Sequence, residues 1–225
     1  MPIRQTVFAQ NEYYHIYNRG VNKRKIFLSP QHYRRAVETL QFYLFTNHKI
    51  RFSYYSRLGN EAKQKYFNDL SDTNISLLSY VLMPNHFHLL VTQTGENGIS
   101  NYLRLFENSY TRYFNTATKR IGPLLQGAFK AVRIETNDQL LHITRYIHLN
   151  PYSSNVVSSM EELEKYPWSS YRSYLEEDKN HLIDTDIISS QFQNLSYKNF
   201  VSEQGEYQRE LDEIKHLTFE NDFSF

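Results

Sequence analysis

Apolar residues recur along this 225-residue chain with two different periods, one typical of strands and one typical of helices. The strand-like segments combine β-branched or aromatic residues with alternation, and most end at Gly, Pro or Asn. Five segments are predicted to be strands by this criterion: 13–18, 50–54, 75–82, 86–92 and 128–134. The Met-Pro-Asn sequence at 83–85 separates two of them, which predicts a β-hairpin.

Other stretches have the three- and four-residue spacing of amphipathic helices. The predicted helices are 30–47, 99–117 and 137–150. The first has a strong start, because Ser29 can cap the helix and Pro30 suits its first turn. We expect the third to end near Asn150, since Pro151 disfavours helical geometry in the residue before it. Residues 56–73 are polar without a clear period and are expected to be irregular, with at most a helical turn.

Apart from the short strand at 50–54, the predicted order is strand, helix, strand, strand, helix, strand, helix. This order is typical of the ferredoxin-like split β-α-β motif, an α+β fold with helices packed on one face of an antiparallel sheet. The hairpin strands can lie at the centre of such a sheet. The length suits one domain, expected over 1–175, with a C-terminal extension over 176–225.

Charge divides the chain unevenly. Residues 1–150 carry a net charge of +10, and residues 151–225 carry −9. This asymmetry indicates a basic body that meets a polyanion and an acidic tail that does not, although a chance distribution of solvated charges would look the same. Aromatic residues make up 16% of the chain, including 19 tyrosines, a composition that suits core edges and base-stacking surfaces alike.

Several classes of protein are disfavoured by composition. The chain has no cysteine, which excludes disulfides and thiolate metal sites and favours a reducing compartment. No window approaches ~18 consecutive apolar residues, and residues 1–5 lack the apolar core of a signal peptide. We therefore expect a cytoplasmic protein without membrane association.

The hairpin contains the first candidate chemistry. Side chains alternate across a strand, so His86 and His88 should share one face while Phe87, Leu89 and Val91 occupy the other. Two imidazoles on one strand can chelate a divalent ion and leave its other positions open. The alternative is two hydrogen-bonded histidines on a half-exposed strand.

The third predicted helix contains the second group of candidate catalytic residues. Its apolar face consists of Leu140, Ile143 and Ile147. Beside that face, His142, Tyr146 and Asn150 form a stripe at four-residue spacing. Tyr146 and Asn150 could lie next to a metal ion held by the hairpin histidines. Tyr146 would then be a nucleophile, and the Asn150 amide oxygen would be a hard ligand for Mg²⁺ or Mn²⁺. His148 lies ~160° around the helix from Tyr146, outside such a site, and Tyr146 could also be an ordinary core-edge tyrosine.

Five ordered blocks of sequence then resemble one family. The hairpin 80–91 resembles the His-hydrophobic-His (HUH) hairpin of the single-tyrosine transposases, and most closely that of the REP-associated tyrosine transposases, which are IS200-like. The other blocks that agree in order are 14–20, 122–130, 146–151 and 166–171, so the resemblance spans roughly 10–175. Several ordered blocks are far more specific than one motif.

The resemblance implies that His86, His88 and Asn150 hold Mg²⁺ or Mn²⁺ and that Tyr146 is the nucleophile. It implies nicking and rejoining of single-stranded DNA through a 5′-phosphotyrosine, on a substrate with a hairpin or palindrome. Relatives include homodimers whose active site uses the tyrosine helix of the partner chain, so a monomer and a homodimer both remain open here. Two other functions also remain open, a non-catalytic nucleic-acid-binding module and a metallonuclease that activates water.

Basic residues near these blocks are candidate phosphate contacts, although solvated surface charge explains each of them equally well. The candidates for DNA binding are Arg19, Lys23, Arg24, Lys25, Lys130 and Arg133.

Overall fold

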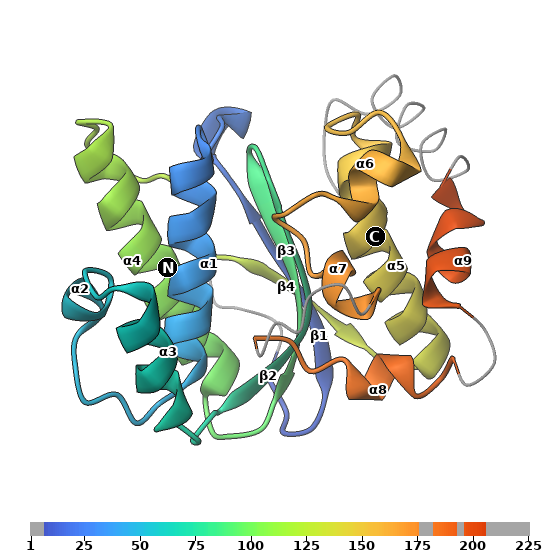
Figure 1. Cartoon of the computed structure of the whole chain (residues 1–225), viewed down its shortest axis with the longest axis horizontal. Coiled ribbons are helices and arrows are strands. Elements are labelled where there is room, and N and C mark those ends of the chain that lie inside the picture. Colours follow the sequence, from blue (N-terminus) through green and yellow to red (C-terminus); the bar gives the residue numbers. More distant parts are fainter. Residues whose placement is uncertain (1–6, 176–181, 193–195, 206–225) are drawn as a thin grey trace.

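The computed structural model describes residues 7–175, 182–192 and 196–205. Its centre is a four-stranded antiparallel sheet in the order β2-β3-β1-β4 (Figure 1). The strands are β1 (Tyr13–Arg19), β2 (Ile75–Met83), β3 (His86–Gln93) and β4 (Lys130–Ile134). This architecture confirms the predicted α+β class and the hairpin formed by β2 and β3.

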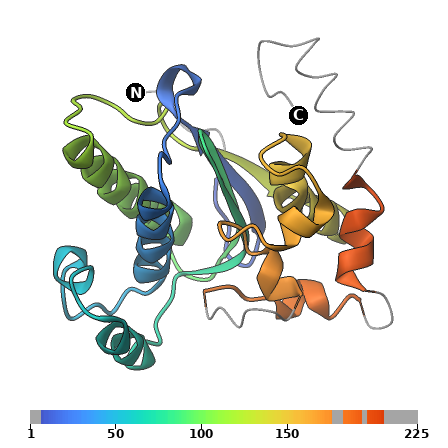
Figure 2. The ribbon, with the colours of Figure 1, turned by 45° about the horizontal axis from the view of Figure 1, so that its top comes forward.

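Helices cover both faces of the sheet. The two helices of the split β-α-β motif, α1 (Pro30–Leu44) and α4 (Gly98–Ala117), lie together on one face (Figures 1 and 2). On the other face lies α5 (Asn137–Ser153), followed by short helices. These are α6 (Met160–Glu164), α7 (Tyr171–Tyr174), α8 (Asp186–Ser189) and α9 (Tyr197–Ser202).

Alternation along β3 separates two cores. Phe87, Leu89 and Val91 are at most 1% exposed and pack with α1 and α4. Leu90 points the other way, into a second cluster that contains Leu140 and Ile147 of α5. Because each face of β3 has its own apolar partner, the register of the strand is fixed, and the histidine face is directed toward α5.

The hairpin strands differ in position. β3 is central, as expected, but β2 lies at the edge of the sheet. A segment from the C-terminal half covers that edge, where Ser169 forms a β-bridge with Val81 and the Leu82 N–H donates to the Trp168 carbonyl at 2.9 Å. The main chain of β2 is therefore hydrogen-bonded on both sides near its end.

The prediction of a strand at 50–54 was wrong, because this segment forms the short helix α2 (Phe52–Tyr55). Phe52 and Tyr55 stand three residues apart and both pack on Phe42 of α1, with ring centroids 5.1 and 5.0 Å away. Short apolar runs fit either period, and here contact with α1 selects the helix. The following segment forms α3 (Asn60–Asn68) instead of an irregular stretch.

The predicted end of the third helix was also wrong, since α5 continues through Pro151 to Ser153. Proline removes only one hydrogen bond so close to the end of a helix. The last turn is deeply buried, with Tyr152 and Ser153 4% and 2% exposed, and this burial outweighs the local preference.

Described residues of the 176–225 extension pack against the rest of the molecule. Asp184 N–H donates to the Leu77 carbonyl at 2.9 Å, and Ile188, Tyr197 and Val201 join the apolar cluster on α5. Much of the predicted acidic tail, 176–181 and 206–225, lies outside the described residues. In the described part of the chain, no helix combines the length and apolar character needed to cross a bilayer.

Candidate active site

β3 directs His86 and His88 to the face of the sheet that α5 covers. Their ring centroids are 5.0 Å apart, and the two rings are nearly perpendicular. In the register with β1, His88 stands opposite Tyr17 and His86 opposite Arg19. The expected pairing of the two imidazoles on one face is therefore present in the folded chain.

His88 is buried and has only one of its ring nitrogens hydrogen-bonded. Its Nδ1 lies 2.9 Å from Nε2 of His15, while its Nε2 is buried without a partner. Burial first, and then the nearby imidazoles of His86 and His15, hold the pKa of His88 well below its ordinary value. His88 is thus a neutral imidazole with one unused nitrogen, an uncommon state for a buried polar group.

His86 lies between two amide oxygens. Its Nδ1 is 2.7 Å from Oδ1 of Asn85, and its Nε2 is 3.2 Å from Oδ1 of Asn150. The orientation of Asn85 is supported by a 3.4 Å hydrogen bond from its Nδ2 to the Lys23 carbonyl. A neutral imidazole has a single N–H, so it cannot donate to both oxygens. If Nδ1–H donates to the nearer oxygen, the Nε2 lone pair faces the Asn150 oxygen.

These donors fit a hard divalent cation. A cation would accept the lone pairs of His86 Nε2 and Asn150 Oδ1, whose 3.2 Å separation is close to the ~3 Å between adjacent ligands at octahedral Mg²⁺ distances. The unpartnered Nε2 of His88 supplies a third donor. Among the described residues, no group of three or more His, Cys, Asp or Glu side chains forms a metal site. The candidate set therefore consists of two imidazoles and one amide.

α5 brings the tyrosine to the histidines. Thr136 caps the helix by accepting the Gln139 N–H, and Leu140 and Ile147 anchor it on the sheet. Tyr146 is half-buried, and its ring centroid lies 5.5 Å from that of His88 and 6.1 Å from that of His15, in edge-on contacts. The tyrosine and the histidine pair therefore meet within a single chain.

His148 lies away from this site, as the helical geometry predicts. Its Nδ1 is 2.7 Å from the Tyr197 hydroxyl of α9, and its Nε2 is 2.8 Å from Oγ of Ser170. Burial lowers the pKa of His148 to about 3, so the ring is neutral near pH 7. This residue joins α5 to the C-terminal helices.

Two predicted DNA contacts share the face of the histidines. Arg19 stands opposite His86 and donates from Nε to Gln126. Lys130 of β4 stands opposite Tyr17, and its Nζ lies 6.0 Å from the centroid of the Tyr17 ring. Both cations therefore lie on the same face of the sheet as the two histidines.

The basic loop lies against the hairpin turn. Val21–Lys23 forms the short 3-10 helix η1, and the Gly20 and Ile26 N–H groups donate to the carbonyls of Asn85 and Pro84 at 2.8 and 2.7 Å. A Cβ at Gly20 would stand 2.3 Å from the Arg24 carbonyl oxygen, so this turn requires glycine. The predicted contacts of this loop, Lys23, Arg24 and Lys25, therefore stand next to the turn that precedes His86.

Arg133, also predicted to bind DNA, occupies a different position. It alternates to the opposite face of β4 from Lys130 and forms an ion pair with Glu12 at 2.8 Å. The hydrogen bond from Arg133 to Glu12, together with the negative charge of Glu12, raises the pKa of Arg133. Arg133 is therefore separated from the histidines by the sheet.

Sequence reasoning missed His15 and Asn85, which lie within hydrogen-bond distance of His88 and His86. Asn85 was treated only as a turn residue, although it directly precedes His86. His15 belongs to the β1 run at alternate spacing with Tyr17, which signals a shared face. Its pairing with His88 depends on the register between β1 and β3, which separate segments of sequence do not reveal.

Comparisons with known proteins identify a family for the chain and a similar fold. Residues 9–150 match the model of the family described as "Transposase IS200 like". The structure is similar to that of a REP-associated tyrosine transposase bound to a REP hairpin, with a TM-score of 0.53, 15% identity, and coverage of 83% of this chain and 90% of that one.

A weaker similarity is to a candidate transposase from Deinococcus radiodurans R1, with a TM-score of 0.37, 13% identity, and coverage of 65% and 95% of the two chains. No protein of curated function matches the sequence.

Proposed function

Because the chain belongs to the family of IS200-like transposases, we propose that it nicks and rejoins single-stranded DNA through a covalent bond to Tyr146. The family match extends to Asn150 and includes every residue of the site described above. The proposal assigns Tyr146 as nucleophile, and His86, His88 and Asn150 as ligands of Mg²⁺ or Mn²⁺.

The observation that carries this proposal is the contact between Tyr146 and His88. A tyrosine ring lies 5.5 Å from an imidazole whose Nε2 is buried and unpartnered. A purely structural histidine would have both nitrogens satisfied, as His148 has. An imidazole that has an unsatisfied nitrogen and contacts a tyrosine ring supports a site built for a ligand and a nucleophile.

Tyr146 performs the covalent step. Its phenolic oxygen attacks a phosphodiester phosphorus, the P–O3′ bond breaks, and a 5′-phosphotyrosine and a free 3′-hydroxyl result, with the phenol proton ending on the 3′-oxygen. The phosphotyrosine retains the diester, so the same 3′-hydroxyl or another can reverse the step without a further energy source. α5 holds the ring in place, because Ile147 beside it is fully buried.

The three proposed metal ligands carry no charge, and this determines how much positive charge a bound ion would present to the DNA. His86, His88 and Asn150 are neutral donors, so a divalent ion held by them keeps its full charge toward the DNA. A bound Mg²⁺ or Mn²⁺ polarises the phosphoryl oxygen and offsets the negative charge that develops there. His15 and Asn85 act behind them: each lies within hydrogen-bond distance of Nδ1 of one ring, and by accepting the N–H of that nitrogen it would direct the opposite nitrogen toward the ion.

The substrate follows from the cations around the site and from the similar structure. That relative is bound to a REP hairpin, and a hairpin flanked by single strand is the substrate we propose here. Arg19 and Lys130 would hold phosphates next to the reacting one, and the basic loop at 23–25 would hold the DNA that passes the hairpin turn. Arg133 would contribute only to DNA on the opposite side of β4.

The test uses a 5′-labelled and a 3′-labelled hairpin oligonucleotide, incubated with the protein and Mn²⁺ and resolved on a denaturing gel. The wild-type chain should give a protein–DNA adduct and a shorter free strand. Tyr146→Phe should keep DNA affinity within about twofold while losing the adduct and the nick, since it removes only the attacking oxygen. The matched control is Tyr113→Phe, a half-buried tyrosine of α4 on the other face of the sheet.

The outcomes separate the competing functions. Cleavage without an adduct would indicate a metallonuclease that activates water, and tight binding without cleavage would indicate a non-catalytic module. An adduct that persists in Tyr146→Phe would move the nucleophile to another residue.

A further inference from the structure

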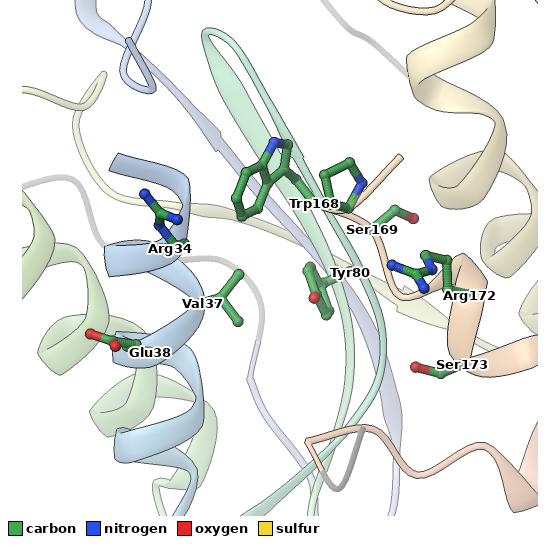
Figure 3. A pocket seen from close by; sticks show the side chains of 9 residues that line it. Arg34, Val37, Glu38, Tyr80, Trp168, Ser169, Arg172 and Ser173 are labelled. Atoms are coloured by element: carbon green, nitrogen blue, oxygen red, sulfur yellow. The ribbon is translucent and has the colours of Figure 1, made fainter. Parts of the chain in front are cut away.

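A depression of about 260 Å³ lies at the β2 edge of the sheet, on the side of α1 (Figure 3). Arg34 and Val37 of α1 form one wall, and Trp168, Ser169 and Arg172 form the other, with Tyr80 of β2 between them (Figure 3). Tyr80 belongs to the core on the α1 side, whereas the histidines face α5. This depression is therefore a separate feature from the candidate active site.

The walls are rigidly attached to the sheet. The Tyr80 N–H donates to Ser170 Oγ at 2.9 Å, and the Ser170 N–H donates to the Tyr80 carbonyl at 3.0 Å. Trp168 stacks on Tyr33 of α1, with centroids 4.9 Å apart and planes at 16°, which joins the two walls. A site with fixed walls loses little conformational entropy when a ligand enters.

The charge of the depression is positive. Among the described residues, neither Arg34 nor Arg172 has a carboxylate within ion-pair distance. Glu38 also lines the depression, but its carboxylate is bound to Lys63 at 2.6 Å. Arg34 and Arg172 therefore stand on opposite walls of a hollow that the Ser169 and Ser173 side chains also line (Figure 3), and planar guanidinium forks with hydroxyl donors match phosphate oxygens.

We infer that this depression binds a backbone phosphate of single-stranded DNA together with its sugar, at a distance from the nicked phosphate. The volume is below the ~300 Å³ of typical small-molecule pockets, which suits one sugar-phosphate unit and excludes a duplex. The inference rests on the proposed function for the identity of the ligand.

The position of the depression favours DNA over a free nucleotide. Tyr80 stands four residues before Pro84, ~13 Å along the strand, and Pro84 accepts hydrogen bonds from the chain that carries the basic loop. A strand leaving the histidines would pass the hairpin turn and this loop before reaching Arg34. Basic side chains would then line the whole path of the DNA strand.

The tests are direct, because Trp168 is the only tryptophan of the chain and lies in the wall. Its fluorescence should change when a short oligothymidylate is added, and much less with thymidine 5′-monophosphate or inorganic phosphate. In the double variant Arg34→Gln and Arg172→Gln this change should disappear. DNA affinity at moderate salt should fall about tenfold, and the slope of log affinity against log salt should become shallower by about 0.7, for one lost phosphate contact.

The matched control is Arg51→Gln, an exposed arginine before α2, which should behave as wild type. At saturating DNA, adduct formation by the double variant should equal that of wild type. If the affinity and salt slope of the double variant match those of the control while wild type forms the adduct, the depression does not bind DNA. If wild type forms no adduct but the arginine-dependent slope remains, the subsite stands and the proposed nicking fails. A full fluorescence response to the free nucleotide would overturn the assignment to a DNA strand.

Discussion

Two buried histidines, His148 of α5 and His88 of β3, differ in how many of their ring nitrogens are hydrogen-bonded. His148 is fully buried, and both of its nitrogens contact hydroxyls, those of Tyr197 and Ser170. His88 is 4% exposed, and only Nδ1 has a partner. Burial lowers the pKa of each ring, so burial alone does not separate them.

The difference lies in what surrounds the second nitrogen. Residues of neighbouring elements bond to both nitrogens of His148, so neither nitrogen is available to a ligand. The ring of His88, by contrast, contacts the ring of Tyr146 and that of His86, which itself lies between two amide oxygens. We infer that His148 stabilises the fold and that the Nε2 atom of His88 binds a cation.

Replacing His88 should give the largest functional effect. His88→Ala should weaken Mn²⁺ binding more than about 100-fold and reduce the DNA adduct below detection, because a ligand of the ion is lost. Titration calorimetry with Mn²⁺ measures the first effect, and the gel assay the second. The free energy of unfolding without metal should fall by about 2 kcal/mol, because the buried ring and its one hydrogen-bond contact, between Nδ1 and His15, are lost. Unaltered Mn²⁺ affinity would contradict a role in coordination.

Replacing His148 should have the reverse profile. His148→Ala leaves the Tyr197 hydroxyl and Ser170 without their partner and opens a cavity, so it should cost about 3 kcal/mol of stability. The melting temperature should fall by about 5–10 °C in calorimetry. Mn²⁺ affinity measured below the transition should stay within about twofold of wild type. A loss of metal affinity in the folded variant would remove the distinction between the two histidines.

His15 tests the second layer of the metal site. His15→Ala should lower Mn²⁺ affinity by about 10- to 100-fold, because nothing then accepts Nδ1–H of His88 and fixes its tautomer. His15→Gln offers an amide oxygen in its place and should recover most of the affinity. Equal affinity in the alanine variant and wild type would show that the orientation of His88 has another source.

Measured per pH unit, the smallest effect is the dependence of stability on pH. The ordinary pKa of histidine is 6.5 and that of folded His148 is about 3, so between these values the unfolded chain binds a proton that the folded chain excludes. Stability should therefore fall as the pH drops through this range, with His148 contributing up to ~1.4 kcal/mol per pH unit. His148→Gln should show a shallower slope in denaturant titrations. An identical slope would mean that His148 does not titrate on unfolding.

Local sequence was sufficient for features that depend on one element. The hairpin, the shared face of His86 and His88, and the exclusion of His148 from the Tyr146 stripe all follow from strand and helix periods. It failed where distant contacts decide, as when Phe42 selects a helix at 52–55 and core packing carries α5 past Pro151. The link from His15 to His88 belongs to the same class, because it requires the register of two strands 73 residues apart.

The segment around Ser169 that covers β2 also limits how this sheet can extend. An uncovered edge strand invites pairing with another chain, through strand addition or aggregation. With the β2 border occupied near its end by the molecule's own backbone, β4 is the remaining border among the described strands. β4 has only five residues and carries Lys130 and Arg133, two charges that discourage an incoming strand. Any self-association of this protein should therefore use helical surfaces and leave the sheet at four strands.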